Sequence, residues 1–212
     1  MSDYSVDDIQ IYTAIEHVRL RPEMHVGNWR QSINIMIFEA TCIGLDEVLE
    51  GNCNRIQIST DEEDFVTVTQ NGNGVSMKTA YGGKTNAEQL LTELFACRDL
   101  KKNKSAARAG GAGIVVVTAL SEYMEFRNYW QGEEWMIEFN RGSITKPFTS
   151  LGPTDKNGTV MRFKPEAEFW PNPHMDVPTL AQRFTSLAPC IESVEVVIET
   201  VLPIPNRTVI NL

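Results

Sequence analysis

Three features are scarce in this sequence, and each scarcity excludes a class of protein. No apolar run approaches the ~20 residues that a membrane-spanning helix requires, and the polar, acidic residues 1–4 are unlike a secretory signal. Lysine and arginine number 19 against 28 aspartates and glutamates, which gives a net charge of −9. This balance argues against a broad DNA-binding surface. We therefore expect neither a membrane protein nor a direct binder of DNA.

Cysteine is also sparse, and its positions form no recognisable pattern. The four cysteines are Cys42, Cys53, Cys97 and Cys190. None belongs to a C-x-x-C pair, and no histidine follows at zinc spacing. Two of them lie in apolar helical contexts, which is typical of buried free thiols. We expect reduced thiols rather than disulfides or a metal site, and a cytoplasmic location.

The rest of the composition is that of a folded domain, with 42% hydrophobic and 22% charged residues. We expect an N-terminal arm at 1–8, flexible in solution, a single domain at 9–200, and a tail at 201–212 that is either a linker or an edge strand. Apolar spacing and turn residues predict the elements. The predicted helices are 9–20, 32–49, 86–97, 114–120 and 177–187. The predicted strands are 55–60, 65–70, 123–129, 134–139, 159–163 and 194–200.

This order of elements, with helices early and strands in hairpins later, indicates the fold class. We expect an α+β two-layer sandwich, with helices on one face of a mixed, mostly antiparallel sheet. A basic segment at 98–108 carries five cations against one aspartate. It is either a solvated loop or a local site for an anion.

The most informative segment is 38–51, which is predicted to be a helix ended by Gly51. Its inward face mixes apolar residues with carboxylates. Because residues i, i+4 and i+7 share a helix face, Glu39, Ile43 and Asp46 are expected to line one wall.

Two glycine-rich segments accompany this helix. The run Asn71-Gly72-Asn73-Gly74 follows a predicted strand and indicates either a tight turn or a close approach of the backbone to a ligand. The run 110–113 opens an apolar segment, where backbone N–H groups could face an anion or small residues could allow close helix packing.

Taken together, these segments resemble the GHKL ATPases, of the type found in DNA gyrase B and topoisomerase IV. The segment 18–27, with the sequence VRLRPEMHVG, is similar to the arm sequence of that family. The resemblance covers roughly 9–200, or one ATPase domain without the transducer domain that follows it in the family. It implies the GHKL (Bergerat) fold, and it implies that Glu39 occupies the position of the general base.

The resemblance also implies which residues contact a nucleotide. These candidate positions are Ile43, Asp46, Glu47, Gln70, Gly72, Gly74, Val75, Gly111, Gly113 and Thr159. Several depart from the family pattern: Ile43 stands where an asparagine holds magnesium, and Gln70 where an aspartate binds adenine. Asn73 replaces an arginine that pairs with the glutamate at Glu47. The family's ATP lid falls on the basic segment 98–109, which lacks most of the lid glycines.

Mg²⁺ requires oxygen ligands, which Ile43 does not offer. We therefore expect no magnesium site, at most weak binding of ATP or ADP, and Glu39 as a remnant of a base. This favours a non-hydrolysing pseudo-enzyme that binds nucleotide or another protein. The alternatives are an active ATPase domain of a type II topoisomerase-like protein, and a binder of a different small ligand in the former ATP pocket.

The resemblance also bears on partners, because gyrase-type domains dimerise through the N-terminal arm. We expect a homodimer or a contact with a topoisomerase subunit. Tyr4 falls where the family arm carries a tyrosine that reaches the partner's nucleotide; a tyrosine in a loose polar terminus is the alternative.

Overall fold

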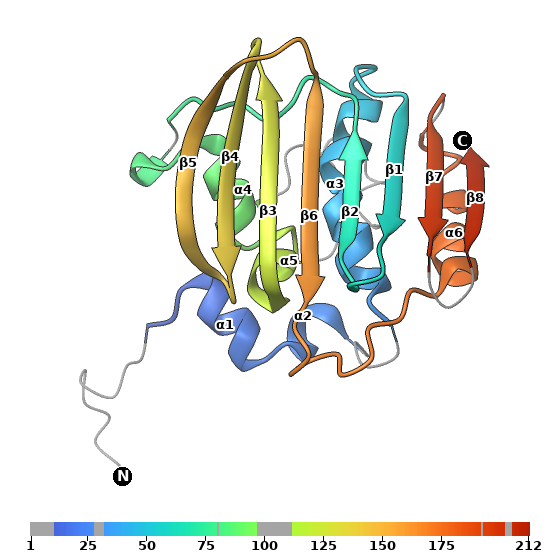
Figure 1. The fold of residues 1–212 in the computed structure, drawn as a ribbon, viewed down its shortest axis with the longest axis horizontal. Helices are drawn as coiled ribbons and strands as arrows, with labels where there is room; N and C mark the ends of the chain where they lie inside the picture. Colours follow the sequence, from blue (N-terminus) through green and yellow to red (C-terminus); the bar gives the residue numbers. More distant parts are fainter. Residues whose placement is uncertain (1–10, 28–31, 80, 97–111, 192, 202–204) are drawn as a thin grey trace.

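The computed structural model describes residues 11–27, 32–79, 81–96, 112–191, 193–201 and 205–212. Its centre is a single eight-stranded sheet with the strand order β5-β4-β3-β6-β2-β1-β7-β8. The helices α3, α4, α5 and α6 lie behind the sheet in Figure 1. The predicted α+β sandwich, with helices on one face of a mixed sheet, is confirmed, and this architecture is GHKL-like.

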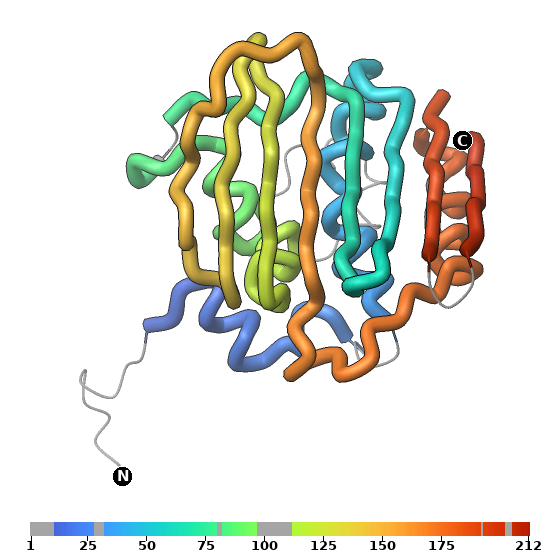
Figure 2. The backbone as a smooth tube through the Cα atoms, in the orientation of Figure 1, coloured from blue at the N-terminus to red at the C-terminus, as the bar shows by residue number. Residues whose placement is uncertain are grey.

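The chain path is easiest to follow in Figure 2, where its colour runs from the N-terminus to the C-terminus. The helices are α1 (Ala14–Leu20), α2 (Glu23–Val26), α3 (Asn34–Leu49), the 3₁₀ helix η3 (Tyr81–Gly83), α4 (Asn86–Thr92), α5 (Val115–Leu120) and α6 (Val177–Thr185). The strands are β1 (Arg55–Thr60), β2 (Val66–Gln70), β3 (Ser121–Trp130), β4 (Glu133–Asn140), β5 (Ser143–Pro153), β6 (Gly158–Pro165), β7 (Glu195–Thr200) and β8 (Asn206–Asn211).

The sheet is antiparallel except at one seam, where β1 and β7 run parallel. The tail predicted to be a linker or an edge strand forms the edge strand β8, which pairs with β7. The opposite edge is β5, which was not predicted. Its residues are almost all exposed, so it shows no alternation of apolar and polar side chains.

Two predicted helices were longer than the observed ones by more than one helical turn. The helix predicted from residue 9 begins at Ala14, because the Thr13 hydroxyl accepts a hydrogen bond from the Glu16 N–H while the Glu16 carboxylate accepts one from the Thr13 N–H. The helix predicted to end at residue 97 ends at Thr92, because Glu93 adopts an extended backbone, with φ −114° and ψ 143°. These are local capping effects that apolar periodicity does not register.

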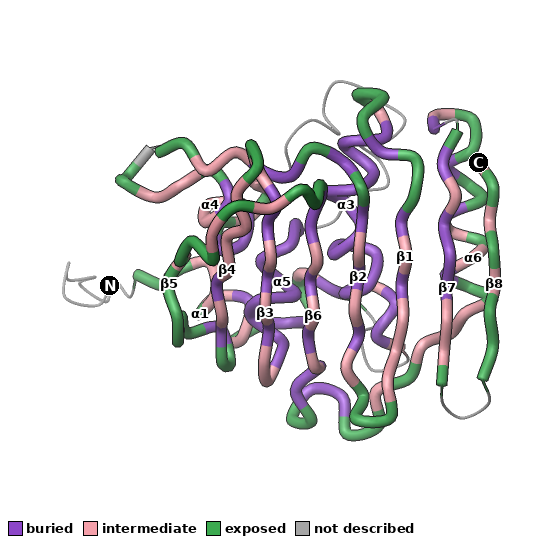
Figure 3. Tube along the Cα trace, turned by 45° about the horizontal axis from the view of Figure 1, so that its top comes forward, coloured by how far each residue is buried: buried purple, intermediate pink, exposed green. Residues whose placement is uncertain are grey.

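The helix α3 is the centre of the core. Every residue from Met36 to Val48 is buried, and the helix packs against β1, β2, α5 and α6. In Figure 3 the buried residues gather on α3, α5 and the central strands, whereas the edge strands β5 and β8 are largely exposed. Any polar side chain on α3 therefore lies in a protein interior, where it requires a partner. No helix in the described part of the chain is long and apolar enough to cross a membrane.

Candidate functional site

The candidate site lies where the end of β2 meets α3. The side chains of Glu39, Asp46 and Glu47 on α3 are at most 4% exposed, and Gln70 at the end of β2 is 3% exposed. Ile43 is also buried. The sequence placed these five residues on two elements, and the structure packs those two elements against each other.

Gln70 fixes the start of the glycine loop 71–75. Its side-chain oxygen accepts a short hydrogen bond from the Gly72 N–H. Its side-chain NH₂ group donates to the Thr159 hydroxyl of β6 at 3.2 Å. These two bonds orient the amide, with its oxygen toward the loop and its nitrogen toward β6. Gln70, Gly72 and Thr159, three predicted contact positions, are thus in one hydrogen-bonded group.

Glu47 holds the middle of the same loop. Its carboxylate oxygen Oε2 accepts a hydrogen bond from the Asn73 N–H at 3.1 Å. In the family that the sequence resembles, the position of Asn73 is occupied by an arginine, which pairs with this glutamate. Here the backbone N–H of Asn73 donates to the carboxylate, so the Glu47 side chain contacts the backbone of the loop.

Asn128 of β3 holds the end of the loop, although the sequence pattern did not predict it as a site residue. Its side-chain oxygen accepts from the Val75 N–H at 2.8 Å, and its NH₂ group donates to the Val75 carbonyl at 2.7 Å. Asn128 is fully buried. A signal was present: Met124, Phe126 and Asn128 alternate on the inward face of one strand, so the amide interrupts an apolar row.

Glu39 lies in a mixed environment of charge and apolar surface. The Sγ atom of Cys42 is 3.9 Å from the Glu39 carboxylate oxygen Oε2. On α6, the Arg183 guanidinium lies over the Phe38 ring at 3.6 Å from its centre. Burial lowers the pKa of Arg183 below its ordinary value, and the negative charge of Glu39 partly offsets this effect. Arg183 was also missed, since nothing in the sequence pattern joins α6 to this site.

The position of Ile43 does not fit a magnesium ion. Its side chain is 4% exposed and belongs to the hydrophobic core, and it offers no oxygen to a cation that takes only oxygen ligands. Within the described ranges, no group of three or more His, Cys, Asp or Glu side chains is arranged to hold a metal.

The second glycine-rich segment is only partly described. Gly113 is buried and has a φ of +97°, immediately before the buried segment that leads into α5. Gly111, the basic segment 98–109, the arm at 1–8 and Tyr4 lie outside the described residues. The expectations for the phosphate loop, the lid and the arm therefore remain predictions. Of the cysteines, Cys42, Cys53 and Cys190 are free thiols, and Cys97 is outside the described residues.

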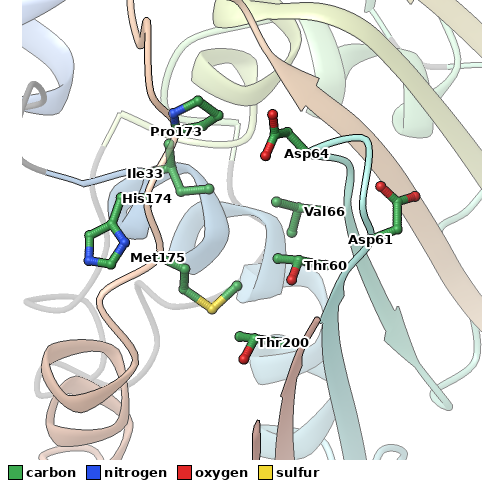
Figure 4. A pocket seen from close by; sticks show the side chains of 9 residues that line it. All are labelled: Ile33, Thr60, Asp61, Asp64, Val66, Pro173, His174, Met175 and Thr200. Carbon is green, nitrogen blue, oxygen red and sulfur yellow. The ribbon is translucent and has the colours of Figure 1, made fainter. Parts of the chain in front are cut away.

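A separate pocket lies at the opposite end of β2 (Figure 4). Its volume is about 460 Å³. It is lined by Ile33, Thr60, Asp61, Asp64, Val66, Pro173, His174, Met175 and Thr200. None of the predicted site residues lines it. In Figure 4, His174 and Asp61 lie on opposite sides of the pocket, and the Asp61 carboxylate is already bonded within its own turn.

The fold is that of a GHKL-like α+β domain. More specifically, the chain belongs to the DNA gyrase B family, as a homologue of its ATPase region. It is 31% identical over 192 residues to the gyrase B protein of Thermotoga maritima, which covers 89% of this chain. It is 33% identical to that of Rickettsia prowazekii and 31% identical to that of Clostridium acetobutylicum, over 88% and 87% of this chain.

This similarity confirms the gyrase-type resemblance seen in the sequence motifs. The match spans 30% of the length of the Thermotoga and Clostridium proteins and 24% of the Rickettsia protein. No protein-family model matches the sequence. What the whole gyrase proteins do therefore does not transfer directly to this chain.

Proposed function

We propose that this chain is a gyrase-B-type nucleotide-binding module that does not hydrolyse ATP efficiently. The observation that supports this most directly is the buried hydrocarbon side chain of Ile43, one helical turn after Glu39. Hydrolysis in this fold requires a magnesium ion beside the base. Without that ion, the charge that develops on the phosphates loses its main stabilisation.

The environment of Glu39 supports the same proposal. A general base needs a pKa matched to its task and access to a water molecule. Glu39 is fully buried, and it interacts electrostatically with the Arg183 guanidinium. A fully buried carboxylate has little access to solvent water, so the second of these requirements is poorly met. We interpret Glu39 as a remnant of the base rather than an active one.

The adenine side of the site supports weak binding. The Gln70 side-chain oxygen is engaged by the Gly72 N–H, and an amide oxygen lacks the charge that strengthens a hydrogen bond to a carboxylate. An adenine ring bound here must share the Gln70 side-chain oxygen with the Gly72 N–H. We therefore propose weak binding of ATP or ADP without Mg²⁺.

The proposal extends to partners and location. Homology to gyrase B supports a homodimer or a contact with a topoisomerase subunit through the N-terminal arm, in the cytoplasm. Sedimentation-velocity ultracentrifugation tests the homodimer. A chain that remains monomeric at high concentration contradicts it.

The decisive measurement is a calorimetric titration of the full chain with ATP, with and without Mg²⁺. We expect weak binding that Mg²⁺ does not strengthen, and no ATP turnover above the Glu39→Ala background. Tight Mg²⁺-dependent binding, with turnover that Glu39→Ala abolishes, would show an active ATPase. No response to ATP in either condition would favour a different small ligand, with Cys42 and Ile43 making the pocket drier.

A pair of variants at one position sharpens this test. Ile43→Asn places an amide oxygen where the family has its metal ligand, whereas Ile43→Leu keeps the site apolar at similar volume. We expect Mg²⁺ to strengthen ATP binding in Ile43→Asn and not in Ile43→Leu, with circular dichroism confirming that both are folded. Equal responses of the two folded variants to Mg²⁺ would show that Ile43 is not the reason for the missing metal site.

A further inference from the structure

The side chain of Gln70 differs from a carboxylate in a way that bears on which base it can bind. A carboxylate only accepts hydrogen bonds, whereas a side-chain amide has an oxygen with two lone pairs and a nitrogen with two N–H groups. Gln70 is 3% exposed, so these four bonding positions lie in the protein interior. Each position without a protein partner there is satisfied only by water or by a bound molecule.

The protein itself uses two of these four positions. The amide oxygen accepts from the Gly72 N–H, and one N–H of the amide donates to the Thr159 hydroxyl at 3.2 Å. Because a backbone N–H can only donate, the first bond fixes which end of the amide is the oxygen. In the described part of the chain Gln70 makes no further side-chain hydrogen bond. One lone pair of its oxygen and one N–H of its nitrogen therefore remain.

Thr159 adds a second group of the same mixed character. It pairs with Gln70 across strands β2 and β6, and it is also 3% exposed. Its hydroxyl accepts from Gln70, and a hydroxyl can donate its own proton as well. Among the described residues no acceptor receives this proton. The two side chains together thus keep donors and acceptors next to each other.

Purine bases differ in what they present at position 6. Adenine carries an amino group, which donates, beside the ring nitrogen N1, which accepts. Hypoxanthine, the base of inosine triphosphate (ITP), reverses both, because its position-6 oxygen accepts and its N1–H donates. A carboxylate matches the amino group of adenine and repels the oxygen of hypoxanthine. An amide with one free N–H and one free lone pair matches either base.

We propose that Gln70 and Thr159 form a base site that does not select adenine, and that this site binds 6-oxopurine nucleotides about as tightly as ATP. The inference rests on the proposed function, because it takes the purine ring to lie against the Gln70 amide. The ligand class is then purine nucleotides with either an amino group or an oxygen at position 6. Gln70 is the residue that sets this specificity.

The test is a calorimetric titration of the full chain with ATP and with ITP, without Mg²⁺. In the wild type the two dissociation constants should agree within about threefold, which is less than one hydrogen bond contributes to an affinity.

Gln70→Glu keeps the shape of the side chain and removes its N–H donors, while its oxygens can still accept from Gly72 and Thr159. The titrations are made at pH 8, well above the ordinary pKa of a glutamate. In this variant ITP should bind at least about tenfold more weakly than ATP, since two acceptors would face each other in a buried site.

The matched control is Gln182→Glu, which makes the same chemical change at an exposed position of α6. It should keep the wild-type ratio of the two affinities. A wild-type chain that binds ATP at least tenfold more tightly than ITP overturns this inference and leaves the proposed function standing. A chain that binds neither nucleotide overturns both. An unchanged ratio in Gln70→Glu, or the same change in Gln182→Glu, also overturns the inference.

A second measurement needs no variant and serves if Gln70→Glu does not fold. Purine riboside triphosphate carries only a hydrogen at position 6, so it offers neither an amino group nor an oxygen to the amide. It should bind the wild-type chain about fivefold or more weakly than both ATP and ITP. Equal binding of all three nucleotides would show that position 6 does not contact Gln70, which contradicts the inference.

Discussion

The two ends of β2 are held by different chemistry. At its start, the Asp61 carboxylate accepts hydrogen bonds from two backbone N–H groups of the turn, at 3.0 Å each, and pairs with Arg162 at 2.8 Å. That pair is more than a third exposed. At its end, the loop 71–75 is held by the side chains of Gln70 and Asn128, which are buried amides, and by the carboxylate of Glu47.

The difference separates an ordinary hairpin turn from a preorganised loop. At the exposed end, water can replace each bond that is lost, so the charge contributes little. At the buried end, removal of an amide leaves backbone groups without a partner in a dry interior, which costs more. A loop that is already rigid loses less conformational entropy when a ligand binds, so more of the interaction energy appears as affinity. The buried end of β2 is therefore the end that a substitution should disturb more.

The largest effect is expected from Gly74→Ala. Gly74 has a φ of +76°, and an added Cβ would collide with the Tyr129 carbonyl and lie 2.9 Å from the Asn128 side-chain oxygen. Backbone strain and the clash together should lower the free energy of unfolding by about 3 kcal/mol or more, measured by urea denaturation.

Gly51→Ala is the control for this variant. Gly51 has the same φ of +76°, but an added Cβ meets nothing within 4 Å. In Gly51→Ala the free energy of unfolding should fall only by the ~1 kcal/mol that a left-handed backbone costs a residue other than glycine. Equal losses in the two variants would mean that the packing around the loop contributes nothing.

An intermediate effect is expected from Asn128→Leu, which keeps the number and branching of the side-chain heavy atoms and removes both hydrogen bonds to Val75. The Val75 N–H and carbonyl would remain buried without partners, which should lower the free energy of unfolding in urea by about 2–3 kcal/mol. Asn71→Ala is the comparison, since the Asn71 side-chain oxygen also accepts from backbone N–H groups, those of Asn54 and Arg55, but at an exposed position. A loss in Asn128→Leu no greater than in Asn71→Ala would contradict the contrast between buried and exposed amides.

The smallest effect is expected from Asp61→Asn, at about 1 kcal/mol or less because the pair is exposed to solvent. Burial alone would raise the pKa of Asp61, but hydrogen bonds from Arg162, Phe65 and Glu63 outweigh it, so the pKa lies below its ordinary value of 3.8. A lowered folded-state pKa stabilises the protein above the unfolded-state pKa, and this contribution is lost as the pH falls through the folded-state value.

The pH dependence is the measurement for this variant. Urea denaturation should show a difference between wild type and Asp61→Asn that is constant from about pH 5 to 7 and shrinks below about pH 4. A difference that grows on acidification would mean that the Asp61 carboxylate destabilises the turn.

The sequence predicted the elements that have a clear apolar period or a strong motif. Strand β1 was predicted with its observed bounds, Arg55–Thr60, and α3 within two residues at its start. Strand β5 was missed, because an exposed edge strand buries too little to show alternation. Helix α2, at four residues, is too short to have a period.

For the site, the sequence located the two segments but not the contacts between them. Motif resemblance identified Gln70, Glu47 and Thr159, and the structure adds how their polar atoms are used. Asn128 and Arg183 reach the site from β3 and α6, so only the three-dimensional packing reveals their part in it. The number of hydrogen bonds that each group can make is known from the sequence, but the partner of each bond is known only from the structure.

The two hydrogen bonds between Asn128 and Val75 have a consequence for how the chain folds. The two residues are 53 positions apart, and Gln70 is 89 positions from Thr159. The β1–β2 hairpin can form from local contacts alone, whereas contacts this distant in sequence form slowly, since they require a large loop to close. We therefore expect the loop 71–75 to take its final shape only after β3 and β6 have joined β2.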